Sequence, residues 1–119
     1  MNAEIRTAKS FLRDAKALMK KYPSLLDDLE ELKSELLDNP TLGVPIGNNA
    51  YKIRMAIRSK RKGKSGGARV ISFVENEVIG LVEMEEDLVV VNLIAIYDKS
   101  ERETMPAEEV RELIAKMEI

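Results

Sequence analysis

The sequence contains neither cysteine nor histidine. Without cysteine the chain forms no disulfide and has no thiol nucleophile. Without histidine it lacks the usual general base at neutral pH, and the two absences together remove the ligands of a typical zinc site. Serine–histidine hydrolases and typical zinc enzymes are therefore excluded. Any catalysis has to use carboxylates, lysines, arginines, tyrosines or hydroxyl groups.

A long hydrophobic run is also missing. The longest one, residues 88–97, is interrupted by Asn92 and is too short to span a bilayer. The first ten residues lack the apolar segment of a secretory signal, so we expect a cytoplasmic protein with no membrane partner. A length of 119 residues with 45% hydrophobic and 34% charged side chains is typical of one globular domain, covering residues 1–119.

Acidic residues are absent from residues 39–74, whereas residues 51–69 contain eight lysines and arginines. The remainder is acidic: from residue 75 onward there are thirteen acids and four bases. Such a concentration of positive charge predicts binding of a polyanion, most simply RNA. A solvated strand face with a charged loop is an equally good interpretation of composition alone. Few aromatics accompany the bases, so no stacking platform is indicated.

Two segments near the N-terminus have apolar residues at helical spacing. In residues 7–21 they fall on one stripe, away from Lys9, Arg13, Lys16 and Lys20. Pro23 interrupts this helix, and Ser24 is a suitable N-cap for a second one that ends before Pro40. A last helix is expected to start at Pro106.

The centre of the chain has the pattern of strands. Residues 51–58 alternate between apolar and basic, residues 59–67 form a Gly/Ser/Lys loop, and residues 68–82 and 88–97 are rich in β-branched residues. We expect an acidic hairpin turn over residues 83–87, a loop over 41–49 and a short extended entry over 3–6. The predicted fold class is α+β: an N-terminal helical hairpin packed on a small antiparallel sheet, with a C-terminal helix.

The cations expected to contact RNA lie on the basic strand face and on the loop that follows it. They are Lys52, Arg54, Arg58, Lys60, Arg61 and Lys62. The triplet at residues 63–65 resembles the end of a phosphate-binding P-loop, but Arg58 stands where that motif needs glycine and a strand follows instead of a helix. A nucleotide site of that type is excluded. The acids of residues 83–87 are better explained by a solvated turn than by a metal site.

Tyr97 and Lys99 follow the most hydrophobic strand, where a rigid scaffold often presents polar groups. They are candidates to face the basic segment. The simpler interpretation is that Tyr97 completes the core and that residues 98–100 form only a turn.

Three segments together resemble the RelE/HigB-like toxins of bacterial toxin–antitoxin modules: residues 51–54 (YKIR), residues 63–71 (GKSGGARVI) and residues 96–101 (IYDKSE). The helical hairpin at residues 11–37 is similar to that group as well. The resemblance implies a RelE-like fold and an endoribonuclease (mRNA interferase) that cuts mRNA on the ribosome. It also implies inhibition by a cognate antitoxin, and a reaction that uses no metal and no small-molecule cofactor because the RNA 2′-hydroxyl attacks the adjacent phosphate.

By the same resemblance, Arg69 matches an arginine that contacts the scissile phosphate, and Tyr97 and Lys99 match a polar cluster. Lys60, Lys62 and Lys64 match a lysine-rich approach to the site. The planar fork of arginine suits two phosphate oxygens. Lys64 and Lys99 are the candidates for proton transfer, and Tyr97 would align the nucleotide or donate a proton. The fold group also includes ParE-like proteins that act on DNA gyrase without cutting RNA, so a non-catalytic binding protein is the alternative.

Overall fold

The computed structural model describes residues 2–79 and 86–119, which form three α-helices and one five-stranded sheet. The helices are α1 (Lys9–Lys21), α2 (Leu25–Asp38) and α3 (Ala107–Ala115). The strands are β1 (Asn2–Thr7), β2 (Val44–Gly47), β3 (Ala50–Met55), β4 (Ala68–Ile79) and β5 (Glu86–Asp98). The expected α+β class is confirmed. In the described part of the chain no helix is long and apolar enough to cross a membrane.

The strands are arranged in the order β1-β5-β4-β3-β2. Neighbours from β2 to β5 are antiparallel, but β1 runs parallel to β5, with Asn2 opposite Leu88 and Thr7 opposite Leu93. The expectation of an antiparallel sheet was therefore wrong, and the sheet is mixed. Alternation along a strand identifies its faces, but it contains no information about which distant strand it will pair with or in which direction.

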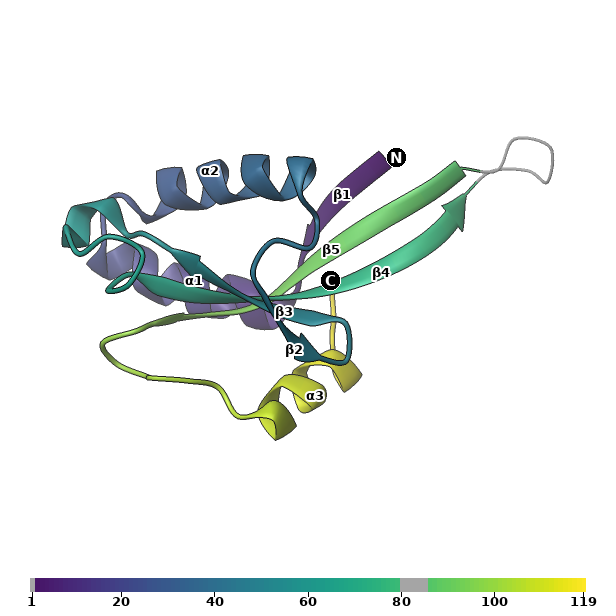
Figure 1. Cartoon of the computed structure of the whole chain (residues 1–119). Helices are drawn as coiled ribbons and strands as arrows, with labels where there is room; N and C mark the ends of the chain where they lie inside the picture. The colour runs from purple at the N-terminus through teal and green to yellow at the C-terminus, as the bar shows by residue number, and fades with distance from the viewer. Residues whose placement is uncertain (1, 80–85) are drawn as a thin grey trace.

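Helices cover both faces of the sheet (Figure 1). The apolar stripes of α1 and α2 pack on one face, in a cluster that includes Phe11, Leu29, Val70 and Leu93. On the other face Val110 of α3 contributes to a second cluster formed by alternate strand residues. Strands β4 and β5 form a long ribbon that extends beyond the other strands (Figure 1).

Several boundaries differ from the sequence-based expectation. The loop expected over residues 41–49 contains the edge strand β2, and Asn48 and Asn49, with φ of 55° and 60°, turn the chain into β3. An edge strand tolerates its proline, which the sequence pattern counted against a strand. Strand β3 ends at Met55, and a short 3-10 turn, η1 (Arg58–Lys60), follows it. Most of the expected acidic turn at residues 83–87 lies outside the described residues.

Candidate nucleic-acid interface

Two predicted site residues, Arg54 and Arg69, face each other across the sheet. Arg54 on β3 is the register partner of Arg69 on β4, and Arg69 is the partner of Tyr97 on β5. Residues in register share a face, so all three lie in one row on the face that α3 covers further along. Two like charges directly opposite each other destabilise a sheet. A bound anion would relieve that repulsion.

Arg69 is 5% exposed, and its guanidinium is directed at the loop that precedes β4. It donates to the carbonyl oxygens of Lys64 (3.0 Å), Ser65 (3.1 Å) and Ala68 (3.2 Å). Burial, and after it the charge of Arg54, lowers the pKa of Arg69 below its ordinary value. In this conformation Arg69 therefore clamps the loop, and Arg54 is the exposed arginine of the row.

Lys60 was predicted to contact RNA, but its side chain is buried in an ion pair. Its Nζ lies 2.6 Å from Asp98 Oδ1 and 2.7 Å from the carbonyl oxygen of Gly66, and the two side chains of the pair are 9% and 0% exposed. Tyr22 and Ser100 also donate hydrogen bonds to the Asp98 carboxylate. Lys60 consequently anchors the loop to the end of β5.

Opposing effects of burial and hydrogen bonding on the pKa of Asp98 determine whether its carboxyl group is charged. Burial alone would raise the pKa of Asp98, but the hydrogen bonds from Lys60, Tyr22 and Ser100 outweigh it and hold that pKa well below the ordinary value. The hydrogen bond to Asp98 raises the pKa of Tyr22 in turn. The carboxylate is thus charged and fully partnered, which makes it a structural group.

Tyr22 and Asp98 were not recognised from the sequence as partners of Lys60. The residues that meet come from the end of α1, the 3-10 turn and the end of β5, separated by 38 and 76 positions. A local signal existed only for Asp98, whose carboxylate accepts from the backbone N–H of Ser100, two residues later, as in an Asx turn.

The loop between η1 and β4 packs closely on β3. A Cβ at Gly67 would lie 2.1 Å from the carbonyl oxygen of Met55, so only glycine fits there. The backbone N–H of Lys99 donates to the Gly67 carbonyl at 3.0 Å. With the Lys60 and Arg69 contacts, the loop is held on three sides.

Arg58 belongs to a different surface. Its guanidinium forms ion pairs with Glu31 and, at 3.8 Å, with Asp28 of α2. Asp28 is 3% exposed and also accepts from the backbone N–H of Arg58 at 3.2 Å. The positive charge of Arg58 is therefore largely neutralised within the chain.

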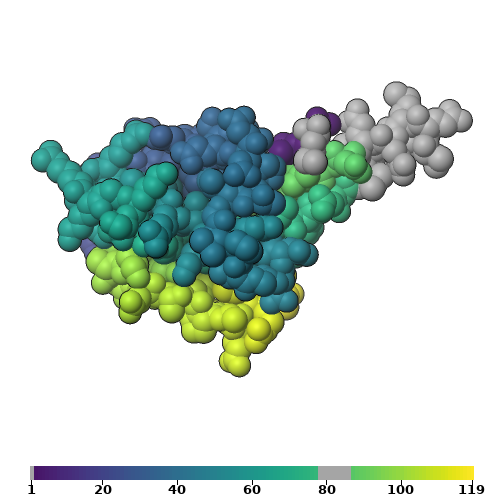
Figure 2. Space-filling model, in the orientation of Figure 1, coloured from purple at the N-terminus to yellow at the C-terminus, as the bar shows by residue number. Residues whose placement is uncertain are grey.

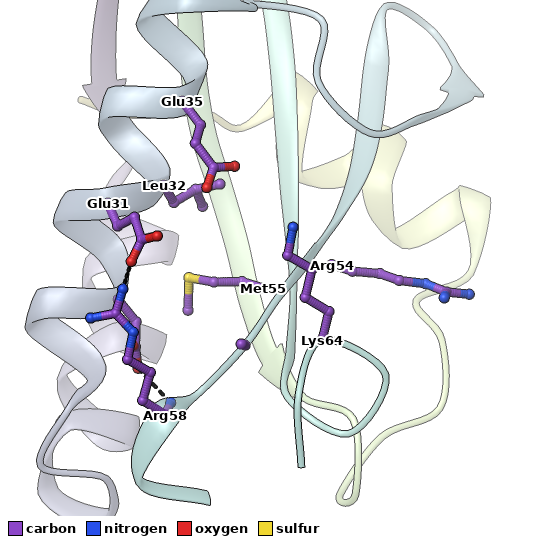
Figure 3. Close-up of a pocket in the computed structure, with 9 residues that line it drawn as sticks. Glu31, Leu32, Glu35, Arg54, Met55, Arg58 and Lys64 are labelled. Atoms are coloured by element: carbon purple, nitrogen blue, oxygen red, sulfur yellow. Dashed lines mark hydrogen bonds and ion pairs between the residues drawn. The ribbon is translucent and has the colours of Figure 1, made fainter. Parts of the chain in front are cut away.

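A small hollow lies between α2 and the start of the loop (Figure 3). Its volume is about 80 Å³, and it is lined by acids of α2 as well as by Arg58 and Lys64. Glu35 and Lys64 point toward it, whereas the side chain of Arg54 extends away (Figure 3). Ligand sites usually occupy at least 300 Å³. This hollow is too small and too acidic for a nucleotide.

The remaining cations are unpaired. Among the bases of residues 51–64, five side chains make no ion pair with any of the described residues 2–79 and 86–119: Lys52, Arg54, Arg61, Lys62 and Lys64. All except Lys52 are exposed. The segment around residue 60, in teal, forms one end of the molecule (Figure 2). A fixed loop with unpaired cations beside an exposed arginine creates a strong local positive potential.

Tyr97 and Lys99 are not directed at these cations. Tyr97 is 8% exposed and belongs to the core cluster under α3, with the Arg102 guanidinium 5.6 Å from its ring centre. Its hydroxyl is buried and has no hydrogen-bond partner in the described parts of the chain. The Nζ of Lys99 donates to the carbonyl oxygen of Glu103 at 3.1 Å. The structure thus brings Arg54, Arg69 and Tyr97 together and holds the Lys99 side chain in the connection to α3.

No known protein family matches the chain, no curated protein is significantly similar to it, and no solved structure matches its fold significantly. Functional assignment therefore depends on the residues themselves.

Proposed function

We propose that this protein is the toxin of a toxin–antitoxin module and cleaves ribosome-bound mRNA in the cytoplasm by attack of the 2′-hydroxyl on the adjacent phosphate. The observation that supports this proposal best is the pairing of Arg54 with Arg69 across β3 and β4, where neither guanidinium forms an ion pair with any described residue. The unpaired cations on the adjoining loop extend the positive electrostatic potential of this arginine pair. The proposed reaction, metal-independent RNA cleavage, is taken from the resemblance of the sequence segments to RelE-like toxins.

In this proposal Arg54 contacts the scissile phosphate and stabilises the charge that develops on it. Lys64 is the candidate for proton transfer, because its side chain is exposed and makes no ion pair within the described residues, while its own carbonyl oxygen accepts a hydrogen bond from Arg69. Lys52, Arg61 and Lys62 bind neighbouring phosphates. Arg69 and Lys60 keep the loop in place, and a cognate antitoxin covers the cations.

The test is cleavage of mRNA on programmed ribosomes, followed by mapping of the new ends. The wild-type protein should cut, and Arg54→Ala should lower the cleavage rate by about a hundredfold, the usual cost of losing one donor to a transition-state oxyanion. Arg111→Ala, an exposed arginine on α3, is the matched control and should cut at the wild-type rate. Intact mRNA after incubation with the wild-type protein would falsify the proposal.

A second candidate is a non-catalytic protein of the RelE/ParE type that binds DNA gyrase or nucleic acid. The burial of Arg69 and Tyr97 favours it, because neither side chain is presented to a ligand. In that case Tyr97→Phe and Lys99→Ala leave binding unchanged, whereas neutralising Arg61, Lys62 and Lys64 weakens it. Binding to ribosomes, gyrase and RNA with these variants distinguishes the candidates.

A further inference from the structure

The outer surfaces of α1 and α2 have opposite charge. Opposite its core residues, α1 has four cations at spacing i, i+4, i+7 and i+11: Lys9, Arg13, Lys16 and Lys20. The outer stripe of α2 has the same spacing, with Asp27, Glu31, Ser34 and Asp38. Both helices contribute to the same core cluster, and each stripe lies on the side of its helix opposite the buried residues. The helical layer is therefore half basic and half acidic.

Exposed apolar side chains accompany both stripes. On α1 these are Leu12 and Met19, 42% and 37% exposed, and on α2 they are Leu26 and Leu37, 56% and 51% exposed. Large apolar side chains are not required on a helix surface that only contacts water. A protein–protein interface, by contrast, buries such side chains among polar residues. The layer thus has the composition of an interface.

Charge complementarity identifies the occupant. A polyanion bound along α1 would be repelled by the acids of the neighbouring helix α2, since charges act over roughly 8–10 Å at physiological salt. A second copy of this chain satisfies both stripes, since its α2 is acidic where α1 is basic. Within the described residues, Lys16, Lys20, Asp27 and Asp38 make no ion pair and are available.

We propose that two copies of this chain associate face to face through their helical layers, with α1 of each copy antiparallel to α2 of the other. A two-fold axis between the helices generates both contacts at once, and the assembly closes. Because both stripes have intervals of four, three and four residues, antiparallel alignment places Lys9 opposite Asp38, Lys16 opposite Glu31 and Lys20 opposite Asp27. Arg13 then faces Ser34. The inference is independent of RNA cleavage.

Charges already engaged on this surface do not prevent the pairing. Lys9 contacts Glu118 at 3.3 Å, Arg13 contacts Asp14 at 3.5 Å, and Glu31, the proposed partner of Lys16, already forms an ion pair with Arg58. The side chains of Lys9, Arg13 and Glu31 are all more than half exposed. Exposed pairs of this kind contribute roughly 0–1 kcal/mol. They can be exchanged for contacts in an interface from which water is partly excluded.

The experiment measures molar mass by sedimentation equilibrium at low salt. The basic variant Ser34→Lys/Asp38→Lys and the acidic variant Lys9→Glu/Arg13→Glu each place like charges across the proposed contact. They also suit the helix dipoles, so folding, checked by circular dichroism, is preserved. The wild-type protein should dimerise and each variant should dissociate at least roughly tenfold more readily. An equimolar mixture of the two variants should recover a heterodimer.

The control is Arg111→Glu, an exposed arginine on α3 that does not line the hollow between α1 and α3, and this variant should dimerise like the wild type. A monomeric wild-type protein at low salt, dimers that persist in either variant, or a mixture that stays monomeric would each overturn the proposal. If the acidic variant loses RNA binding while the wild type is monomeric, the stripe serves a polyanion and the proposal is equally overturned.

Discussion

The buried ion pair between Lys60 and Asp98 shows that a lysine within a cationic run can have a structural role. Its Nζ is shared among a carboxylate, a carbonyl oxygen and a hydroxyl, so no donor is left for a ligand. Lys62, two positions later, is exposed and unpaired. The two lysines form a natural matched pair for mutagenesis.

We expect Lys60→Met to lower the free energy of unfolding by about 3 kcal/mol, because it leaves the buried Asp98 carboxylate without its cation. Lys62→Met should leave stability within about 0.5 kcal/mol of the wild type and should weaken RNA binding. Chemical denaturation and RNA titration measure the two effects. Equal stability of both variants would show that the ion pair does not form.

The pH dependence of stability depends on the same carboxylate. The folded-state pKa of Asp98 is below its ordinary value of 3.8, so the group stabilises the fold above that value and loses this contribution as the pH falls toward the folded-state pKa. Stability should therefore decrease below about pH 4. Asp98→Asn should be less stable at pH 7 by about 2–3 kcal/mol and should show a shallower acid dependence in thermal melts.

The Tyr97→Phe variant tests whether the Tyr97 side chain serves only the hydrophobic core or also takes part in RNA cleavage. The Tyr97 hydroxyl is buried without a partner in the described residues, which carries a cost that phenylalanine avoids. We expect the variant to be as stable as the wild type or more stable by about 1 kcal/mol, with unchanged RNA cleavage. A large loss of cleavage in a stable variant would instead assign the hydroxyl to the reaction.

At the scale of elements, the loop before β4 packs so closely on β3 that its conformation requires glycine at the point of contact. Gly67→Ala should destabilise the protein by at least about 2 kcal/mol, because the added methyl group meets the Met55 carbonyl and the backbone has to shift. Gly63→Ala is the control: its φ is +61° but its Cβ would meet nothing within 4 Å, so only the backbone cost of about 1 kcal/mol applies. Thermal denaturation compares them.

The helices and central strands could be predicted because each has one apolar face. In α1 the helical spacing correctly identified Phe11, Ala15 and Leu18 as core residues, but Leu12 and Met19, assigned to the same stripe, are exposed. The buried leucines of α2 are those that the spacing identified. The edge strand β2 was missed because its proline and glycine favour turns, and the direction of β1 was missed because its partner is more than eighty positions away.

The site residues were predicted less well than the fold. The alternation of buried and exposed side chains along β4 shows why. Arg69 and Ile71 share a face, and Ile71 is 1% exposed, so the same alternation that identified the strand also placed Arg69 toward a covered face. Burial of Lys60 depended on Asp98, a residue 38 positions away, and no local pattern contains that information.

For the whole molecule, the uneven charge predicts how RNA binding responds to salt. Each cation that contacts a phosphate steepens the dependence of log K on log salt by about one. Neutralising Arg61, Lys62 and Lys64 together should reduce the slope by roughly three, whereas neutralising Arg58, already paired with Glu31, should change it little. Binding titrations at several salt concentrations provide the slopes.

The parallel pairing of β1 with β5 has a consequence for synthesis. β1 leaves the ribosome before β5, its hydrogen-bonding partner, which is translated more than eighty codons later. Long-range contacts of this kind form late, after the intervening chain has been ordered. The nascent polypeptide therefore has to keep β1 unpaired until β5 has been translated, and only then can this parallel pair of strands form.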